Sequence, residues 1–152
     1  MIDEESVAVK ISSLPLPAEP QGEAQDYVLP TDPDSLTDIR LGQEMLRLAA
    51  WRGFAKRIVG QLDAELTTAE AHYKAVYHYR AVAQREKLGK AANGDTVEAF
   101  LMAEDEELRL EAERILALKV LKLRVTTREE IYAAFFAALS REQSRRMERN
   151  KI

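Results

Sequence analysis

Residues 55–83 read AKRIVGQLDAELTTAEAHYKAVYHYRAVA, and this stretch decides the fold. Side chains that are apolar, or can pack as if they were, recur in it at steps of three and four residues: Ala55, Ile58/Val59, Leu62, Leu66, Ala69, Tyr73, Val76, Arg80 and Ala83. This spacing keeps a stripe on one face of an α-helix. A stripe of this length predicts a long helix that packs against a partner helix of similar length.

The helix is expected to begin near residue 36. In the stretch from Pro33 to Asp38, Ser35 or Asp34 can cap free backbone N–H groups, and Asp38 lies three residues after Ser35, in capping-box position. Thr67-Thr68-Ala69-Glu70 could form a second capping box and so break the helix. Because the apolar stripe crosses it without a change of phase, we favour continuity and leave a kink near residue 67 open.

The clearest break in the helical region is Leu88-Gly89-Lys90-Ala91-Ala92-Asn93-Gly94-Asp95. Gly89 suits a helix C-terminus, and Asn93-Gly94 tolerates positive φ, so we expect the chain to reverse here. The return stripe runs from Val97 to Leu139 and is interrupted by the polar residues Asp105 and Arg128. Thr126-Thr127 leaves a second kink open.

Together these patterns predict an all-α fold, a long antiparallel helical hairpin that resembles a coiled coil. Its two arms would span about residues 36–89 and 95–148. At 1.5 Å per residue, each arm would be roughly 80 Å long. Equal arms around one Gly-rich reversal are what an antiparallel helix pair requires.

Residues 1–34 are predicted to form an extended, acidic, Pro-rich arm. Val7, Val9 and Ile11 alternate with other residues as in a short strand, and the stretch 14–20 contains three prolines, which favour extended backbone. Two interpretations are open, a disordered tail and an arm that becomes ordered on a neighbouring subunit. The regularly placed apolar residues slightly favour the second.

The net charge of −4 is unevenly distributed. Residues 1–35 contain eight acids and one base, whereas the rest of the chain has a small basic excess. We therefore expect the arm and the body to attract each other, within a subunit or between neighbours. The chain has no apolar run of membrane-spanning length and an acidic N-terminus, so we expect an intracellular soluble protein without a membrane partner.

The sequence predicts no enzyme, no cofactor and no small-molecule substrate. The chain contains no cysteine, so it lacks thiol chemistry and Cys-based metal sites. His72 and His78 are six residues apart, whereas two metal ligands on one helix would be three or four apart. No phosphate-binding loop or nucleophile motif is present, and the acidic run at residues 104–113 is explained by a solvated helix face.

Two sets of residues are candidates for function. A two-helix hairpin leaves outer apolar residues to be covered, so self-association or docking into a larger assembly is expected to cover them. The candidate assembly contacts, in the arm and in the helices, are Val7, Val9, Ile11, Leu14, Leu16, Trp51, Phe54, Phe135 and Phe136. Tyr77, Tyr79 and Phe100 are also expected on the outer surface.

The second set is basic. Reversal near residue 92 would bring two groups of bases to the same level of the hairpin, where they could contact phosphates without reading sequence. These candidate phosphate contacts are Arg52, Lys56, Arg57, Lys122 and Arg124. Ordinary surface charge, interleaved with acids, is the favoured alternative.

Residues 65–146 contain Ala69-Glu70…Tyr73-Lys74, the Gly-rich reversal, residues 103–108 and Ser140-Arg141-Glu142…Arg145-Arg146. With these features they resemble small helical proteins encoded by tailed phages. Some of these proteins are recombination mediators, oligomeric rings that load a recombinase onto single-stranded DNA. The resemblance implies no particular functional residue, and the arm lies outside it.

The leading hypothesis is a non-enzymatic, oligomerising helical protein that builds or braces a larger assembly, such as a phage particle. Its partners would be copies of itself or other subunits of that assembly, and it would lie in the host-cell cytoplasm or in the virion. The alternative is a phage-type recombination accessory protein that binds single-stranded nucleic acid.

Overall fold

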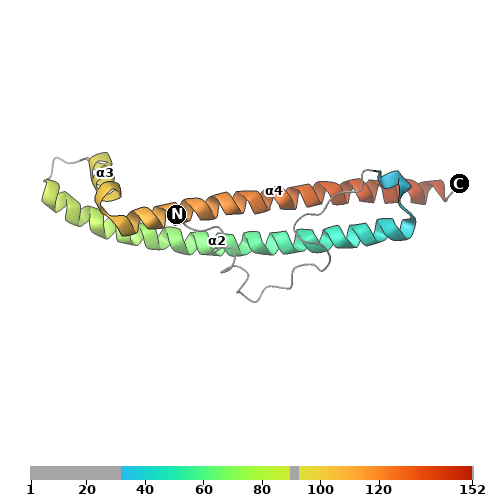
Figure 1. The fold of residues 1–152 in the computed structure, drawn as a ribbon, viewed down its shortest axis with the longest axis horizontal. Helices are drawn as coiled ribbons and strands as arrows, with labels where there is room; N and C mark the ends of the chain where they lie inside the picture. The colour runs from blue at the N-terminus through green and yellow to red at the C-terminus, as the bar shows by residue number, and fades with distance from the viewer. Residues whose placement is uncertain (1–31, 90–92, 152) are drawn as a thin grey trace. The chain divides into compact units, whose positions relative to one another are not determined.

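The computed structural model describes residues 32–89 and 93–151, and these ranges form helices without any β-strand. A short 3₁₀ turn, η1 (Pro33–Ser35), precedes α2 (Asp38–Leu88), α3 (Gly94–Glu104) and α4 (Glu106–Arg149) (Figure 1). The all-α prediction is confirmed. The predicted arm lies, except for its last three residues, outside the described residues.

The residue that caps the start of α2 differs from the predicted one. The side chain of Thr37, rather than that of Ser35 or Asp34, accepts a hydrogen bond from the backbone N–H of Arg40 (3.2 Å). The Asp34-Ser35 segment instead forms η1, which Asp32 caps through the N–H of Asp34. At the other end, Gly89 follows the helix with φ of +88°, as the sequence predicts.

α2 and α4 are each uninterrupted at the threonine pairs where a break was left open. The hydroxyls of Thr67 and Thr68 donate to the carbonyls of Asp63 and Ala64, one turn earlier, at 2.8 and 2.9 Å. Thr127 bonds to Leu123 in the same way. These side chains are therefore satisfied by their own helix and do not cap a new one.

The second arm, predicted as a single helix with a possible kink only near residue 126, is instead two helices. Asp105 has non-helical backbone angles and separates α3 from α4. Its N–H donates to the carbonyl of Leu101, and its carboxylate accepts from the N–H of Leu108. One residue thus ends α3 and caps α4, since a short acidic side chain is well suited to an N-cap.

α3 begins at Gly94, one residue before the predicted start of the second arm at residue 95. The side chain of Asn93 accepts from the N–H of Thr96 (2.8 Å) and so caps the helix. Gly94 is the first residue of α3 and not part of a turn.

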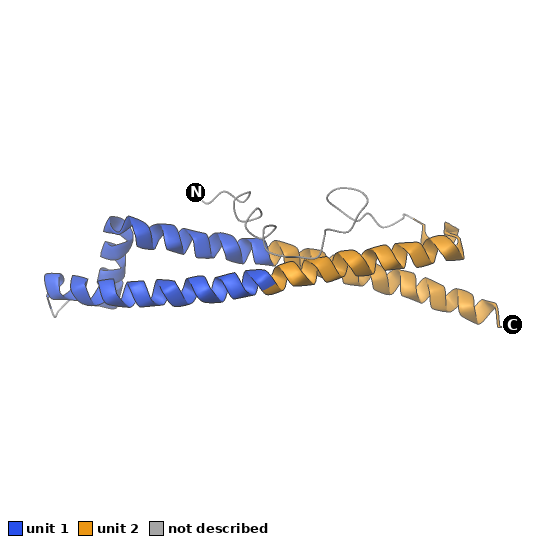
Figure 2. Ribbon diagram, turned by 90° about the horizontal axis from the view of Figure 1, so that it is seen from below, with its two compact units in different colours: residues 1–14, 61–122 blue, residues 15–60, 123–152 orange. Residues whose placement is uncertain are grey.

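The chain divides into two compact units (Figure 2). In the described residues, unit 1 contains 61–89 and 93–122, and unit 2 contains 32–60 and 123–151. In unit 1, the end of α2 packs against α3 and the first part of α4 around a cluster of Ala81, Val97, Leu101 and Leu108. Leu62, Leu66, Ala69 and Leu118 are also buried. Ala83, which the stripe places inside, is exposed, and Ala81 is buried in its place.

In unit 2, the first part of α2 packs against the last part of α4. The buried cluster consists of Leu41, Leu48, Trp51, Ala55, Tyr132 and Leu139. The pairing is antiparallel, because Asp38 of α2 contacts Arg146, whereas Arg52, further along α2, contacts Glu129. In unit 1 the partners likewise run in opposite directions, from Asp63 with Lys122 to Glu70 with Lys119. No helix in the described ranges is long and apolar enough to cross a membrane.

Candidate functional site

The aromatic residues of the helices that were predicted as assembly contacts pack, wholly or in part, into the core of unit 2. Trp51 is only 5% exposed, so its prediction as an outer residue is wrong. Its ring lies 6.0 Å from that of Phe54, edge to face, and 6.4 Å from that of Tyr132. Aromatic pairs favour these separations. Phe54, Phe135 and Phe136 are half-buried against the same cluster.

Other aromatic residues do lie on the surface. Tyr79 is 78% exposed and Phe100 40% exposed, as the sequence predicts, whereas Tyr77 is half-buried against the core of unit 1. The five candidate contacts of the arm, Val7, Val9, Ile11, Leu14 and Leu16, lie outside the described residues.

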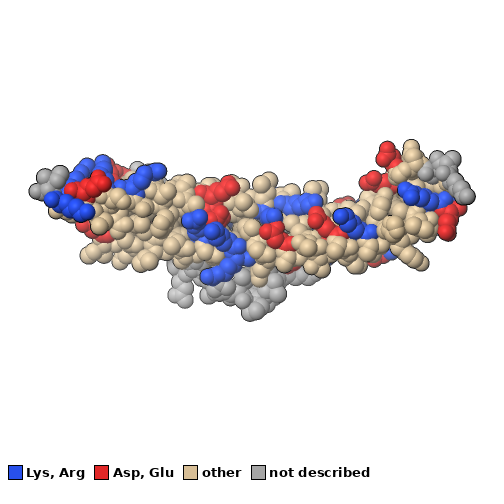
Figure 3. Space-filling view, turned by 180° about the vertical axis from the view of Figure 1, so that it is seen from behind, with Lys and Arg blue, Asp and Glu red and all other residues tan. Residues whose placement is uncertain are grey.

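Two of the five basic residues predicted to contact phosphate pair with acids. In unit 2, Nε of Arg52 donates to Glu129 at 2.8 Å, and Arg124 also has an interaction within the chain. In unit 1, Nζ of Lys122 lies 2.5 Å from Asp63. Lys56 and Arg57 of unit 2 are exposed. The face drawn in Figure 3 accordingly shows basic and acidic side chains interleaved.

The acidic run near the start of α4 is organised by one base from α2. Arg80 donates to both carboxylate oxygens of Asp105 and to Glu107. Burial alone would raise the pKa of the Asp105 carboxyl, but the hydrogen bonds from Arg80 and from the N–H of Leu108 outweigh it and leave that pKa below its ordinary value. Arg80 was counted in the apolar stripe of α2, but it forms an ion pair with Asp105, the polar residue that interrupts the return stripe.

The basic C-terminal segment binds the residues that lead into α2. Arg146 donates to Asp38 at 2.8 Å and to the carbonyls of Pro33 and Asp34 at 3.0 and 3.3 Å. Arg145 contacts the carboxylate of Asp34 at 2.5 Å. Both arginines also bind the buried carboxylate of Glu142. Asp34, the last acid of the predicted arm, thus makes the expected contact with the basic body.

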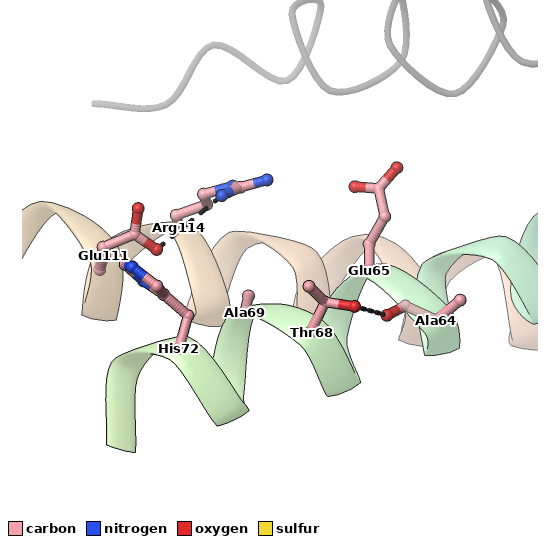
Figure 4. Close-up of a pocket in the computed structure, with 7 residues that line it drawn as sticks. All are labelled: Ala64, Glu65, Thr68, Ala69, His72, Glu111 and Arg114. Carbon is pink, nitrogen blue, oxygen red and sulfur yellow. Dashed lines mark hydrogen bonds and ion pairs between the residues drawn. The ribbon is translucent and has the colours of Figure 1, made fainter. Parts of the chain in front are cut away.

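Unit 1 contains a hollow of about 510 Å³ between α2 and α4. Figure 4 shows short side chains of α2 along it, with longer polar side chains from both helices around them. The lining residues are Ala64, Glu65, Thr68, Ala69, His72, Glu111 and Arg114. Sequence reasoning missed this hollow, although the small residues at 64, 68 and 69 were a usable signal, since they leave space beside a long helix.

The described residues contain no cluster of three or more metal-ligating side chains. Both histidines are exposed. Comparisons of this chain with protein-family models, with curated proteins and with solved structures find no significant match.

Proposed function

We propose that this chain is a non-enzymatic subunit whose helices form a long antiparallel hairpin and which associates with further subunits to build or brace a larger assembly. The observation that carries the proposal is the exposure of large apolar side chains on the helices. Six of them are at least 59% exposed: Ile39, Leu46, Tyr79, Leu116, Leu123 and Met147. Their burial by other subunits would contribute favourably to association.

The hairpin is supported by the pairing of charges in each unit. In unit 2 the partners of α2 move backwards along α4 as α2 advances, and the same holds for unit 1. The unbroken course of α2 and α4 through their threonine pairs supports long arms. The break at Asp105 makes the second arm two helices.

The oligomeric state of the full chain tests this proposal. Light scattering over a range of concentrations should give a mass several times that of the 17.2 kDa chain, with helical circular dichroism unchanged on dilution. A folded protein that stays monomeric over that range, alone and with the other proteins of its genomic neighbourhood, would sink the proposal. The resemblance to helical proteins of tailed phages makes a virus particle the first assembly to examine.

A further inference from the structure

One exposed face of α2 in unit 1 is almost free of charge. Successive exposed residues on it are Thr68, Ala71, His72, Ala75, Tyr79 and Val82. At 100° per residue, they project within a sector of about 100°. None is Asp, Glu, Lys or Arg, although 32% of the chain's residues are charged. Depletion of charge and an accessible tyrosine are typical of the centre of a protein interface.

The same face carries both a protruding side chain and a hollow. Tyr79 is 78% exposed and therefore projects from the helix. Thr68 and His72, which line the hollow, lie eleven and seven residues earlier in the same stripe. The alanines and Thr68 offer the hollow an apolar base, while Glu65, His72, Glu111 and Arg114 supply polar groups (Figure 4). Such a mixture suits a tyrosine, which has an apolar ring and a polar tip.

A two-fold axis would bring these complementary features together. If two α2 helices cross antiparallel with the axis between residues 73 and 74, residue 79 of each copy lies opposite residue 68 of the other. Ala75 and His72 lie nearest the axis, Ala75 of each copy opposite His72 of the other, and the small side chain of Ala75 leaves room for the imidazole. A two-fold interface must be self-complementary, and a projection with a matching hollow on one face meets that condition.

We infer that this face of α2 binds the same face of a second copy of the chain, with Tyr79 of each copy seated in the hollow of the other. The inference rests on the proposed function, because it names the partner and the surface for one contact of that assembly. Val82, on the same face and three residues beyond Tyr79, is 46% exposed.

Disulfide cross-linking tests this geometry. The chain contains no cysteine, so any disulfide must form between the introduced residues. In an Ala75→Cys variant, the two introduced thiols lie close to the axis, so mild oxidation should give a covalent dimer that a reductant reverses. Ala137→Cys, at an exposed alanine of α4 in unit 2, is the matched control and should cross-link far less.

Substitution of the tyrosine tests the chemistry. Tyr79→Ala should weaken dimerisation by about tenfold or more, as truncation of a central interface tyrosine does, and should reduce the Ala75→Cys cross-link. Tyr79→Phe keeps the ring and should retain most of the association. Because Tyr79 is exposed, circular dichroism should show that all these variants remain helical.

The outcomes separate this inference from the proposed function. Oligomers by light scattering without a cross-link at Ala75→Cys, or with equal cross-linking at Ala137→Cys, would overturn the tyrosine contact and leave the proposed function standing. Association unchanged by Tyr79→Ala would do the same. A protein that stays monomeric at every concentration, alone and with the other proteins of its genomic neighbourhood, would overturn both.

Discussion

Arg80 of α2 donates to both carboxylate oxygens of Asp105, the single residue between α3 and α4. Each residue interrupts an apolar stripe in its own part of the sequence. In unit 1, Arg80 and Asp105 lie in contact and form one ion pair, so each charge has a partner of opposite sign. The same aspartate caps α4 through the N–H of Leu108.

Removal of this arginine should loosen α3. In an Arg80→Ala variant, Asp105 and Glu107 face each other without a cation, which disfavours the packing of α3 on α2. We expect amide hydrogen exchange to become faster over residues 94–104 and to change little over residues 61–70. Arg85→Ala, an exposed arginine in the last turn of α2, is the control and should leave exchange in α3 unaltered. Equal exchange in Arg80→Ala and the unmodified chain would show that the ion pair does not hold α3.

Acid should destabilise unit 2 through Glu142. The hydrogen bond from Arg146 lowers the pKa of this carboxyl from its ordinary 4.5, burial opposes the shift, and Arg145 adds to it. Below that ordinary value the unfolded chain binds more protons at this site than the folded chain, so the free energy of unfolding falls as pH decreases. The contribution is complete above about pH 4.5 and is lost as the pH drops through the lowered pKa.

Thermal unfolding between pH 3 and 7 measures this effect. Glu142→Gln should flatten the acid side of the melting-temperature profile, while the exposed Glu148→Gln should leave it unchanged. Identical profiles for the two variants would show that Glu142 does not contribute to the acid sensitivity.

The sequence predicts much of this fold because helical periodicity depends on local spacing alone. Leu62, Leu66 and Ala69, taken from the stripe, are buried. The break at Asp105 was not predictable from the stripe, which keeps its phase through that residue. Asp105 pairs with Arg80, 25 residues away, and a contact at such a separation has no periodic signal. The burial of Trp51 was missed because an aromatic side chain on a helix can pack within one chain as well as between chains.

Two neighbouring leucines of α2 should differ sharply in their effect on stability. Leu48 is fully buried in the core of unit 2, whereas Leu46 is 74% exposed. Leu48→Ala removes apolar contacts and leaves a cavity, so we expect a loss of about 2–5 kcal/mol in the free energy of unfolding. At a protein concentration low enough for the chain to be monomeric, Leu46→Ala should change it by less than about 0.5 kcal/mol. Urea unfolding at a fixed protein concentration measures both, and equal losses would contradict the placement of these residues.

The pairing of basic residues with acids bears on the nucleic-acid alternative. Since Arg52 and Lys122 contact Glu129 and Asp63, we expect no measurable binding of single-stranded DNA at physiological salt. Fluorescence anisotropy with a labelled oligonucleotide measures this at low and at physiological salt. Salt-sensitive binding that is lost when Lys56 and Arg57 are both changed to Glu would instead favour a recombination accessory protein.

The hydrogen bonds from Arg146 to the carbonyls of Pro33 and Asp34 affect how far the N-terminal segment can reach. It fixes the point from which residues 1–31 leave the helices, beside the last turns of α4 in unit 2. Covalent geometry limits a segment of this length to about 110 Å from that point, whatever its conformation. A neighbour within this radius meets the segment at a high effective concentration, because the tether replaces free diffusion. Release of the arginine would move the point of attachment and so change which neighbours the segment can reach.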